Sequence, residues 1–283
     1  MVLESIISPH KAEQKPAIML LLGFIYATVG VFLSLMVFRT HSSMIMVFLA
    51  AMASIPLIYN MIIMEEEKDL QGMGEGWLLK EHAKALSVFI WLFIGMTIAF
   101  SLWYSVLSPE TVSVLFQSQS DTINSINGRA TGFVGSQFES FSSIFLNNVR
   151  VLVFCILFSF LYGSGAIFIL SWNASVIGAA MGNIIRTELA SIATNIGSPT
   201  IIHYFQIGTY SLFRYVIHGI PEILAYFMAG LAGGIISIAA IRHDFGTKKF
   251  EHILLDSADL LLLALVTVFI AGVLEVWITP LIF

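Results

Sequence analysis

The sequence has little charge. Only 11% of its 283 residues are Asp, Glu, Lys or Arg, where a typical soluble domain has about 25%. Hydrophobic residues make up 58% of the chain, and its mean hydropathy is +0.90. This balance excludes a soluble globular protein and indicates an integral membrane protein whose main partner is the lipid bilayer. No basic tract is present, so we expect no nucleic acid as a partner.

Cysteine and the common hydrolase motifs are also scarce or missing. The single cysteine, Cys155, excludes an intramolecular disulfide bond. Neither H-E-x-x-H nor G-x-S-x-G occurs in the chain. We therefore assign no catalytic residue, no metal ligand and no cofactor from the sequence.

Apolar segments fix the expected fold class. A membrane-spanning helix needs about 20 mostly apolar residues. The expected spans are 17–38, 44–64, 85–107, 145–171, 174–195, 214–241 and 259–281. The segment 174–195 contains Arg186 and Glu188, and its alternative is a helix lying at the membrane surface. The sequence predicts an all-α, polytopic transmembrane helix bundle with about seven spans.

The lysines suggest an orientation. With the N-terminus inside, the cytoplasmic segments are 1–16, 65–84 and 242–258, and they contain every lysine of the chain. This distribution follows the positive-inside rule. We therefore predict a multi-pass protein of the cell membrane with its N-terminus inside and its C-terminus outside. The acidic stretch "EEEKD" (65–69) is interpreted as part of a solvated loop.

The chain divides into three expected parts. Residues 1–110 form an accessory three-helix membrane region, and residues 145–283 form a four-helix core. Between them, residues 111–144 form an outer loop, in which Phe138, Phe141 and Phe145 have helical spacing. This spacing predicts an amphipathic helix that either lies on the outer leaflet or packs on the protein itself.

Polar residues of three spans converge on the outer third of the membrane. By insertion scales a charge inside a span costs about 3 kcal/mol, so it normally faces a partner or water. Glu222 lies one turn beyond His218 on the same helix face. Pro221 either follows a helix start near 218, leaving 200–217 as a separate re-entrant piece, or kinks a continuous helix. The cluster comprises Asn147, Asn148, Arg150, Asn173, Arg186, Glu188, Arg214, His218 and Glu222.

Two G-x-x-x-G motifs allow close helix packing. The first joins Gly178 to Gly182, and the second joins Gly230 to Gly234. This spacing lets the backbones of membrane helices touch. We expect the two helices that contain these motifs, the fifth and sixth spans, to pack together, and the alternative is a contact within a homo-oligomer.

Three motifs, taken in order, resemble the stage II sporulation protein M family. They are "NNVR" (147–150), "NASVIG" (173–178) and "HGIPEILAYFMAGLAGG" (218–234), and the resemblance covers about 145–241. It implies a polytopic membrane protein of the bacterial and archaeal cell envelope, and it transfers no established enzymatic activity to this chain. The family's namesake works with peptidoglycan-cleaving partners during engulfment, as their membrane anchor. The resemblance assigns no role to the matching positions, which are Asn147, Asn148, Asn173, His218 and Glu222.

Three functions remain open from the sequence. The first is a non-enzymatic envelope scaffold or anchor for partner proteins, in which an arginine of the fourth or fifth span pairs with Glu222. The second is a carrier or channel with an outward-facing site for an anion or a lipid headgroup. The third is an intramembrane hydrolase, in which His218 and Glu222 act as base and orienter or as two ligands of a metal.

Overall fold

The computed structural model describes residues 6–70, 75–132, 137–162, 165–195, 197–242 and 246–282. Within these ranges the regular structure is helical, and no strand is present. Seven helices are long and apolar enough to cross a membrane. The predicted all-α bundle with seven spans is therefore confirmed.

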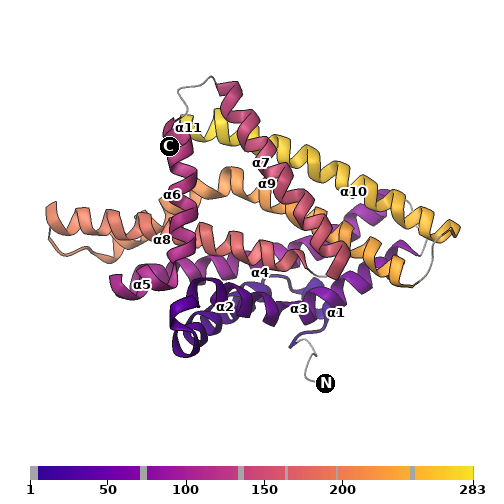
Figure 1. Cartoon of the computed structure of the whole chain (residues 1–283), viewed down its shortest axis with the longest axis horizontal. Coiled ribbons are helices and arrows are strands. Elements are labelled where there is room, and N and C mark those ends of the chain that lie inside the picture. The colour runs from indigo at the N-terminus through magenta and orange to yellow at the C-terminus, as the bar shows by residue number, and fades with distance from the viewer. Residues whose placement is uncertain are drawn as a thin grey trace.

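Most of the long helices run close to the long axis of the molecule, and one of them, α7 (Gln137–Tyr162), crosses it obliquely (Figure 1). They are α2 (Ile18–Val37), α3 (Ser42–Asp69), α4 (Glu75–Val106), α7 (Gln137–Tyr162), α8 (Ala166–Asn195), α9 (Ile201–Ile241) and α10 (Lys248–Val273). After α10 the chain continues through a π-helical turn, Leu274–Ile278, into the short α11 (Thr279–Ile282). The remaining elements are α1 (Pro9–Gln14), a 3₁₀ turn at Arg39–His41, α5 (Pro109–Leu115) and α6 (Gln117–Gly132).

Side-chain caps explain where several helices begin. The Ser108 hydroxyl accepts a hydrogen bond from the Thr111 amide at 3.3 Å, directly before Pro109 opens α5. The Thr247 hydroxyl accepts from the Phe250 amide at 3.2 Å at the start of α10. Such caps satisfy amide groups that have no partner inside the helix.

Glycines bring α2 and α4 into backbone contact. A Cβ atom on Gly23 would lie 2.1 Å from the Leu92 carbonyl oxygen, and one on Gly95 would lie 2.0 Å from the Leu20 carbonyl oxygen. No side chain fits at such distances, so only glycine allows this approach. The same principle holds α3 close to α2 at Gly30, where a Cβ would lie 2.6 Å from the Met46 carbonyl oxygen.

The helices that carry the two G-x-x-x-G motifs, α8 and α9, pack together, but the two motifs do not lie against each other. Gly178 and Gly182 face α4, where added Cβ atoms would lie 2.7 Å from Phe100 and 2.6 Å from Tyr104. Gly230 faces Ala166 at the start of α8. Gly233, inside the second motif, lies close to the Ile156 carbonyl oxygen of α7, while Gly234 is buried. The motif identifies helices that pack closely but not which helix each one meets.

One predicted boundary is wrong, and one open alternative is decided. The fourth span ends at Tyr162, and residues 166–171 already belong to α8. Hydropathy is high on both sides of this break, but the sequence between Tyr162 and Ala166 is Gly-Ser-Gly, a turn signal. In addition, residues 201–217 are not a separate piece, because α9 runs unbroken from Ile201 to Ile241 with Pro221 inside it. Proline removes one backbone hydrogen bond, and packing along a long helix tolerates that loss.

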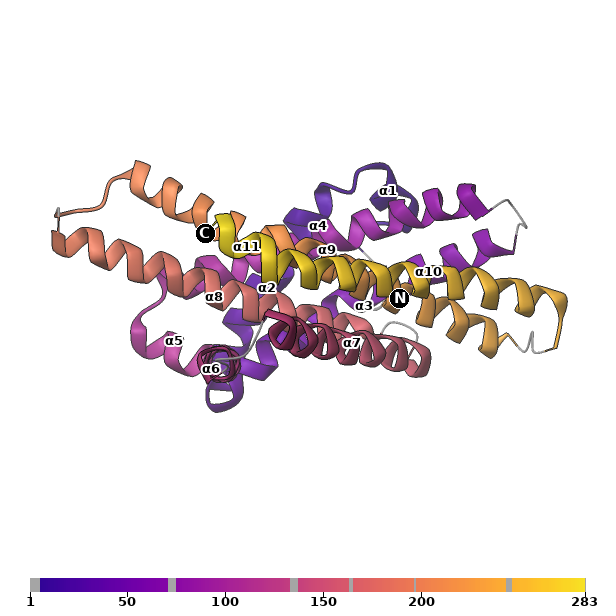
Figure 2. The same ribbon diagram turned by 90° about the horizontal axis from the view of Figure 1, so that it is seen from above.

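The expected outer loop is largely helical. Its first part forms α5 and α6, and α6 runs across the long axis of the bundle (Figures 1 and 2). Its second part forms the first turns of α7, where Phe141 and Phe145 pack against Phe269 of α10 at ring-centroid distances of 5.3 and 5.8 Å. The division of the chain near residue 110 stays a prediction, because α4 packs on α2 and α8 alike.

One part of the molecule extends beyond the bundle. The C-terminal end of α8 and the N-terminal end of α9 project together at the left of both views (Figures 1 and 2). We name residues 187–217 the α8–α9 hairpin. Its tip lies past the level of Leu107, where α4 has ended and where Arg186 of α8 donates a hydrogen bond to the Leu107 carbonyl. Its base, at Leu212 and Tyr215, lies against α4.

Candidate functional site

The first candidate site surrounds Glu222 on α9. Glu222 is half-buried and accepts a hydrogen bond of 2.7 Å from the hydroxyl group of Tyr226, which is fully buried. Glu275, in the π-helical turn, lies within electrostatic range of Glu222. Single π-helical turns often occur at functional sites. We name Glu222, Tyr226 and Glu275 the α9 carboxylate site.

Asn148 is the buried polar residue of α7. Its side chain is 4% exposed, and its Nδ2 atom has no hydrogen-bond partner among the described residues. Further along α7, Cys155 lies within electrostatic range of Tyr226. Helices α7 and α9 run toward the same end of the bundle (Figure 2). Along α7, Asn148 comes two turns before Cys155, and along α9, Glu222 comes one turn before Tyr226. Asn148 therefore lies toward the Glu222 end of the contact between the two helices.

Arg150 and Arg186 of the predicted cluster do not reach the α9 carboxylate site. Arg150 lies on the exposed face of α7. Arg186 donates a hydrogen bond to the Leu107 carbonyl and lies 5.9 Å from the ring centroid of Tyr104. Among the described side chains, no ion pair joins either arginine to Glu222. The expected pair of Glu222 with an arginine of the fourth or fifth span is therefore wrong.

Other members of the predicted cluster are also dispersed. Asn147 and Glu188 are exposed. The Asn173 amide donates a hydrogen bond of 2.9 Å to the Ile169 carbonyl of its own helix. The side chains of Arg214 and His218 lie outside the described residues. The predicted depths ignored the rotation of each helix about its axis, and that rotation separates Arg150 and Arg186 from Glu222.

His203 does not complete a metal site. Its Nδ1 atom accepts a hydrogen bond of 3.1 Å from the Thr200 amide and so caps the start of its own helix. Fifteen residues of helix, about 22 Å, separate it from position 218. Among the residues that the structure describes, no group of three His, Cys, Asp or Glu side chains is placed to hold a metal ion.

A second polar site was missed by the sequence analysis. Glu65 is 0% exposed, and its carboxylate accepts hydrogen bonds from Lys68 Nζ at 2.6 Å and from His82 Nδ1 at 2.7 Å. Lys68 also donates to Glu13 of α1 at 2.8 Å, and His82 Nε2 lies 3.3 Å from an Asp69 carboxylate oxygen. We name Glu13, Glu65, Lys68, Asp69 and His82 the α3–α4 ion-pair cluster.

Two further helices join this end of the bundle. Arg242, just after α9, pairs with the buried Glu66 and lies 3.5 Å from Glu67. On α10, His252 lies 3.5 Å from the Asp256 carboxylate. The interpretation of "EEEKD" as part of a solvated loop is therefore wrong. The segment is the last turn of α3, and its first two glutamates are fully buried.

The charges explain how this cluster holds together. Both ring nitrogens of His82 face a carboxylate, which suits the charged imidazolium form with its two N–H donors. Burial raises the pKa of the Glu13 carboxyl above its ordinary value, although the Lys68 ammonium opposes this change. A buried ion network of this kind holds helices together and supplies no nucleophile. Its sequence signal was the four-residue spacing of Glu65 and Asp69, which puts both on one helix face.

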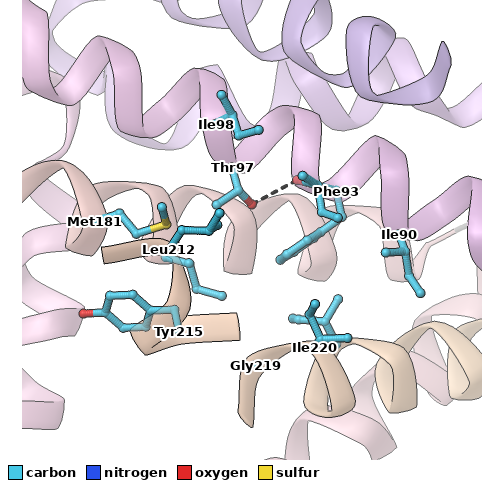
Figure 3. A pocket seen from close by; sticks show the side chains of 12 residues that line it. Ile90, Phe93, Thr97, Ile98, Met181, Leu212, Tyr215, Gly219 and Ile220 are labelled. Carbon is cyan, nitrogen blue, oxygen red and sulfur yellow. Dashed lines mark hydrogen bonds between the residues drawn. The ribbon is translucent and has the colours of Figure 1, made fainter. Parts of the chain in front are cut away.

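An apolar cavity lies between α4, α8 and α9. Its volume is about 170 Å³. Figure 3 shows Phe93 and Thr97 of α4 on one side and Leu212, Tyr215 and Ile220 of α9 on the other. Ile98, Leu212 and Ile220 are each more than a third exposed, so the cavity opens at the protein surface.

Substitution of Glu222 by glutamine tests the α9 carboxylate site. A glutamine amide oxygen can still accept the Tyr226 hydrogen bond, and the change removes a charge from a membrane span. We expect the thermal unfolding midpoint in detergent to stay unchanged or rise. Tyr226→Phe removes the donor and should cost about 1 kcal/mol of the free energy of unfolding. A large fall in the midpoint for Glu222→Gln would instead reveal a cationic partner.

Comparison with known proteins identifies the family. The family model described as Stage II sporulation protein M matches residues 87–280. No curated protein and no solved structure matches the chain. The family match is wider than the motif resemblance at 145–241, because it begins inside α4 and ends in α11. On the strength of a match over more than half of its length, the chain belongs to the stage II sporulation protein M family.

Proposed function

We propose that this membrane protein is an envelope scaffold of the cell membrane, which anchors a partner protein through the α8–α9 hairpin. The observation that carries the proposal is the apolar surface of this projecting hairpin. Ile201 is 87% exposed, Phe205 is 75% exposed and Phe213 is 54% exposed. Large apolar patches on a protein surface mark sites of interaction with other proteins or with membranes.

The hairpin also has a hollow that suits a partner's side chain. An open apolar hollow of about 500 Å³ lies between α9 and the C-terminal end of the chain. It is lined by Phe205, Tyr210, Phe213 and Ile282, among others. Anchoring residues of protein interfaces are commonly aromatic side chains that fill such hollows.

The separation of Arg150 from Arg186 favours a scaffold over a carrier. A carrier for an anion needs cationic groups that converge on one site. Arg150 lies on the exposed face of α7, and Arg186 is bound to the end of α4. In the predicted orientation the hairpin faces outward, which is where the peptidoglycan-cleaving partners of the family's namesake act.

Site-specific photo-crosslinking in native membranes tests the proposal. A photoreactive phenylalanine analogue at Phe205 should give a discrete adduct with another protein. The matched control is Phe48, which is 51% exposed on α3, away from the hairpin, and should give adducts with lipid only. Equal labelling patterns at the two positions would count against a partner at the hairpin. An adduct with a second copy of the chain would replace the anchor by a homo-oligomer.

A further inference from the structure

We propose that the outward face of α7 binds a membrane-spanning helix of a partner protein, and that this helix carries a carboxylate opposite Arg150. The inference goes beyond the scaffold function, because it assigns a second interaction surface, inside the membrane, and the chemistry of what covers it. It rests on the pattern of exposed residues along α7, on the charge in the middle of that pattern and on the depth of that charge.

Helix α7 has a buried face and an opposite, exposed face. The buried face consists of Asn148, Leu152, Cys155 and Ser159. On the opposite side, exposed residues recur at alternating spacings of three and four, and they are Ser143, Leu146, Arg150, Val153, Leu157 and Phe160. We name these six residues the α7 outer stripe. Two helices that pack along a common seam use this spacing. Since α7 lies at the edge of the bundle (Figure 2), the stripe is open to a neighbouring molecule.

Arg150 is the member of the stripe that lipid does not suit. Lipid tails cover the four apolar members as well as another protein would. A charge inside a span, in contrast, normally faces a partner or water. No hydrogen bond or ion pair joins Arg150 to another residue that the structure describes. The anion that pairs with it therefore belongs to a further molecule.

The depth of Arg150 favours a protein carboxylate over a lipid phosphate. About 20 Å of helix separates Arg150 from Gln137 at one end of α7, and about 18 Å separates it from Tyr162 at the other. Arginines near the ends of a span extend their side chains to the lipid headgroups. An arginine in the middle of a span needs an anion at its own depth, and an acidic residue on a neighbouring span supplies one.

A second copy of this chain suits the stripe less well. Two copies in a membrane are most simply related by a two-fold axis along the membrane normal, and the same residues then meet across that axis. The two Arg150 side chains would face each other, and like charges in an interface repel. A partner of opposite charge avoids this repulsion. A single polar residue in an otherwise apolar seam also selects one partner against others.

The experiment measures the binding of model transmembrane peptides to the full-length protein in phosphatidylcholine vesicles and mildly alkaline buffer. The peptides are leucine-alanine helices with a central glutamate or, as the matched probe, a central glutamine. They carry an acceptor dye, and the protein carries a donor dye on its N-terminal amine. We expect energy transfer to show about tenfold tighter binding of the glutamate peptide, the effect of one charge-assisted contact. Arg150→Gln should abolish this preference. Arg39→Gln, which changes an exposed arginine in the turn between α2 and α3, should keep it.

A charge swap and a steric variant test the same surface independently. Arg150→Glu should reverse the preference, so that a peptide with a central lysine binds more tightly than the glutamate peptide. Val153→Trp adds bulk to the stripe one turn from Arg150 and should weaken binding of every peptide. Leu262→Trp is its matched control, because Leu262 is equally open to the membrane but lies on α10.

Each alternative result overturns a stated part of the proposal. If the wild type binds the glutamate and glutamine peptides equally, the stripe does not recognise a carboxylate. If Arg150→Gln keeps the preference, another cation makes the contact. A preference that disappears when phosphatidylglycerol replaces phosphatidylcholine assigns Arg150 to anionic lipid. Energy transfer between labelled copies of the protein that Val153→Trp abolishes assigns the stripe to a second copy. Crosslinking at Phe205 is independent of all these results, so the scaffold function and this surface can fail separately.

Discussion

Replacing Glu65 by alanine is expected to lower the free energy of unfolding by about 3–5 kcal/mol, because it strands buried cations. In the native structure the Glu65 carboxylate is 0% exposed and accepts from both Lys68 and His82. Without it, both cations stay near this end of the bundle with fewer anionic partners. Equilibrium unfolding of the purified protein in detergent, followed by circular dichroism, measures the change.

Glu67→Ala is the matched control for that experiment. Glu67 is two residues away on the same helix, its side chain is 58% exposed, and it lies 3.5 Å from Arg242. An exposed ion pair contributes about 0–1 kcal/mol, so the control should lose little stability. Equal losses for the two variants would mean that Glu65 is not buried among cations. The α3–α4 ion-pair cluster would then be wrong as described.

Gly95→Ala should be the most damaging of the small-to-large substitutions. The added Cβ would lie 2.0 Å from the Leu20 carbonyl oxygen, and backbone atoms cannot move aside as a flexible side chain can. We expect a loss of about 3 kcal/mol in the free energy of unfolding, the upper end for overpacking. The same detergent unfolding assay measures it. Gly23→Ala, on the other side of the same contact, should behave alike, since its Cβ would lie 2.1 Å from Leu92.

Gly208→Ala separates crowding from helix propensity. Both glycines lie inside helices, where alanine is intrinsically favoured by about 1 kcal/mol. A Cβ on Gly208 meets no atom within 4 Å, so this variant should gain stability where Gly95→Ala loses it. If Gly95→Ala also became more stable, α2 and α4 would not be in backbone contact. The result therefore tests the helix packing directly.

The sequence was sufficient for the number and type of the spans. Each span is a run of apolar residues long enough to cross a bilayer, and this property depends on local composition alone. The family was also readable, because "NNVR", "NASVIG" and "HGIPE" are contiguous motifs. The burial of Asn148 and the position of Glu222 inside α9 agree with that pattern. The orientation of the termini and the division of the chain near residue 110 stay predictions.

Helix boundaries were only partly within the reach of the same reasoning. Hydropathy is high on both sides of residues 163–165, but these residues are Gly-Ser-Gly, a turn signal that reasoning from apolar runs passed over. At Pro221 the sequence left two alternatives open, and the structure has the continuous helix. The proline alone does not decide between them, because contacts between helices outweigh the local preference of the chain there.

The partners of the charged residues were decided by the tertiary structure alone. Depth along a span follows from the sequence, but the direction in which a side chain points depends on how its helix is rotated against its neighbours. That rotation puts Arg150 on the exposed face of α7 and Arg186 on the end of α4, away from Glu222. It also buries Glu65 beside Lys68 and His82, at a segment whose sequence predicts solvent. Composition and spacing determined that this chain is a helical membrane protein of a known family. Long-range packing determined which of its charges meet, because the contacting residues lie on helices far apart in the sequence.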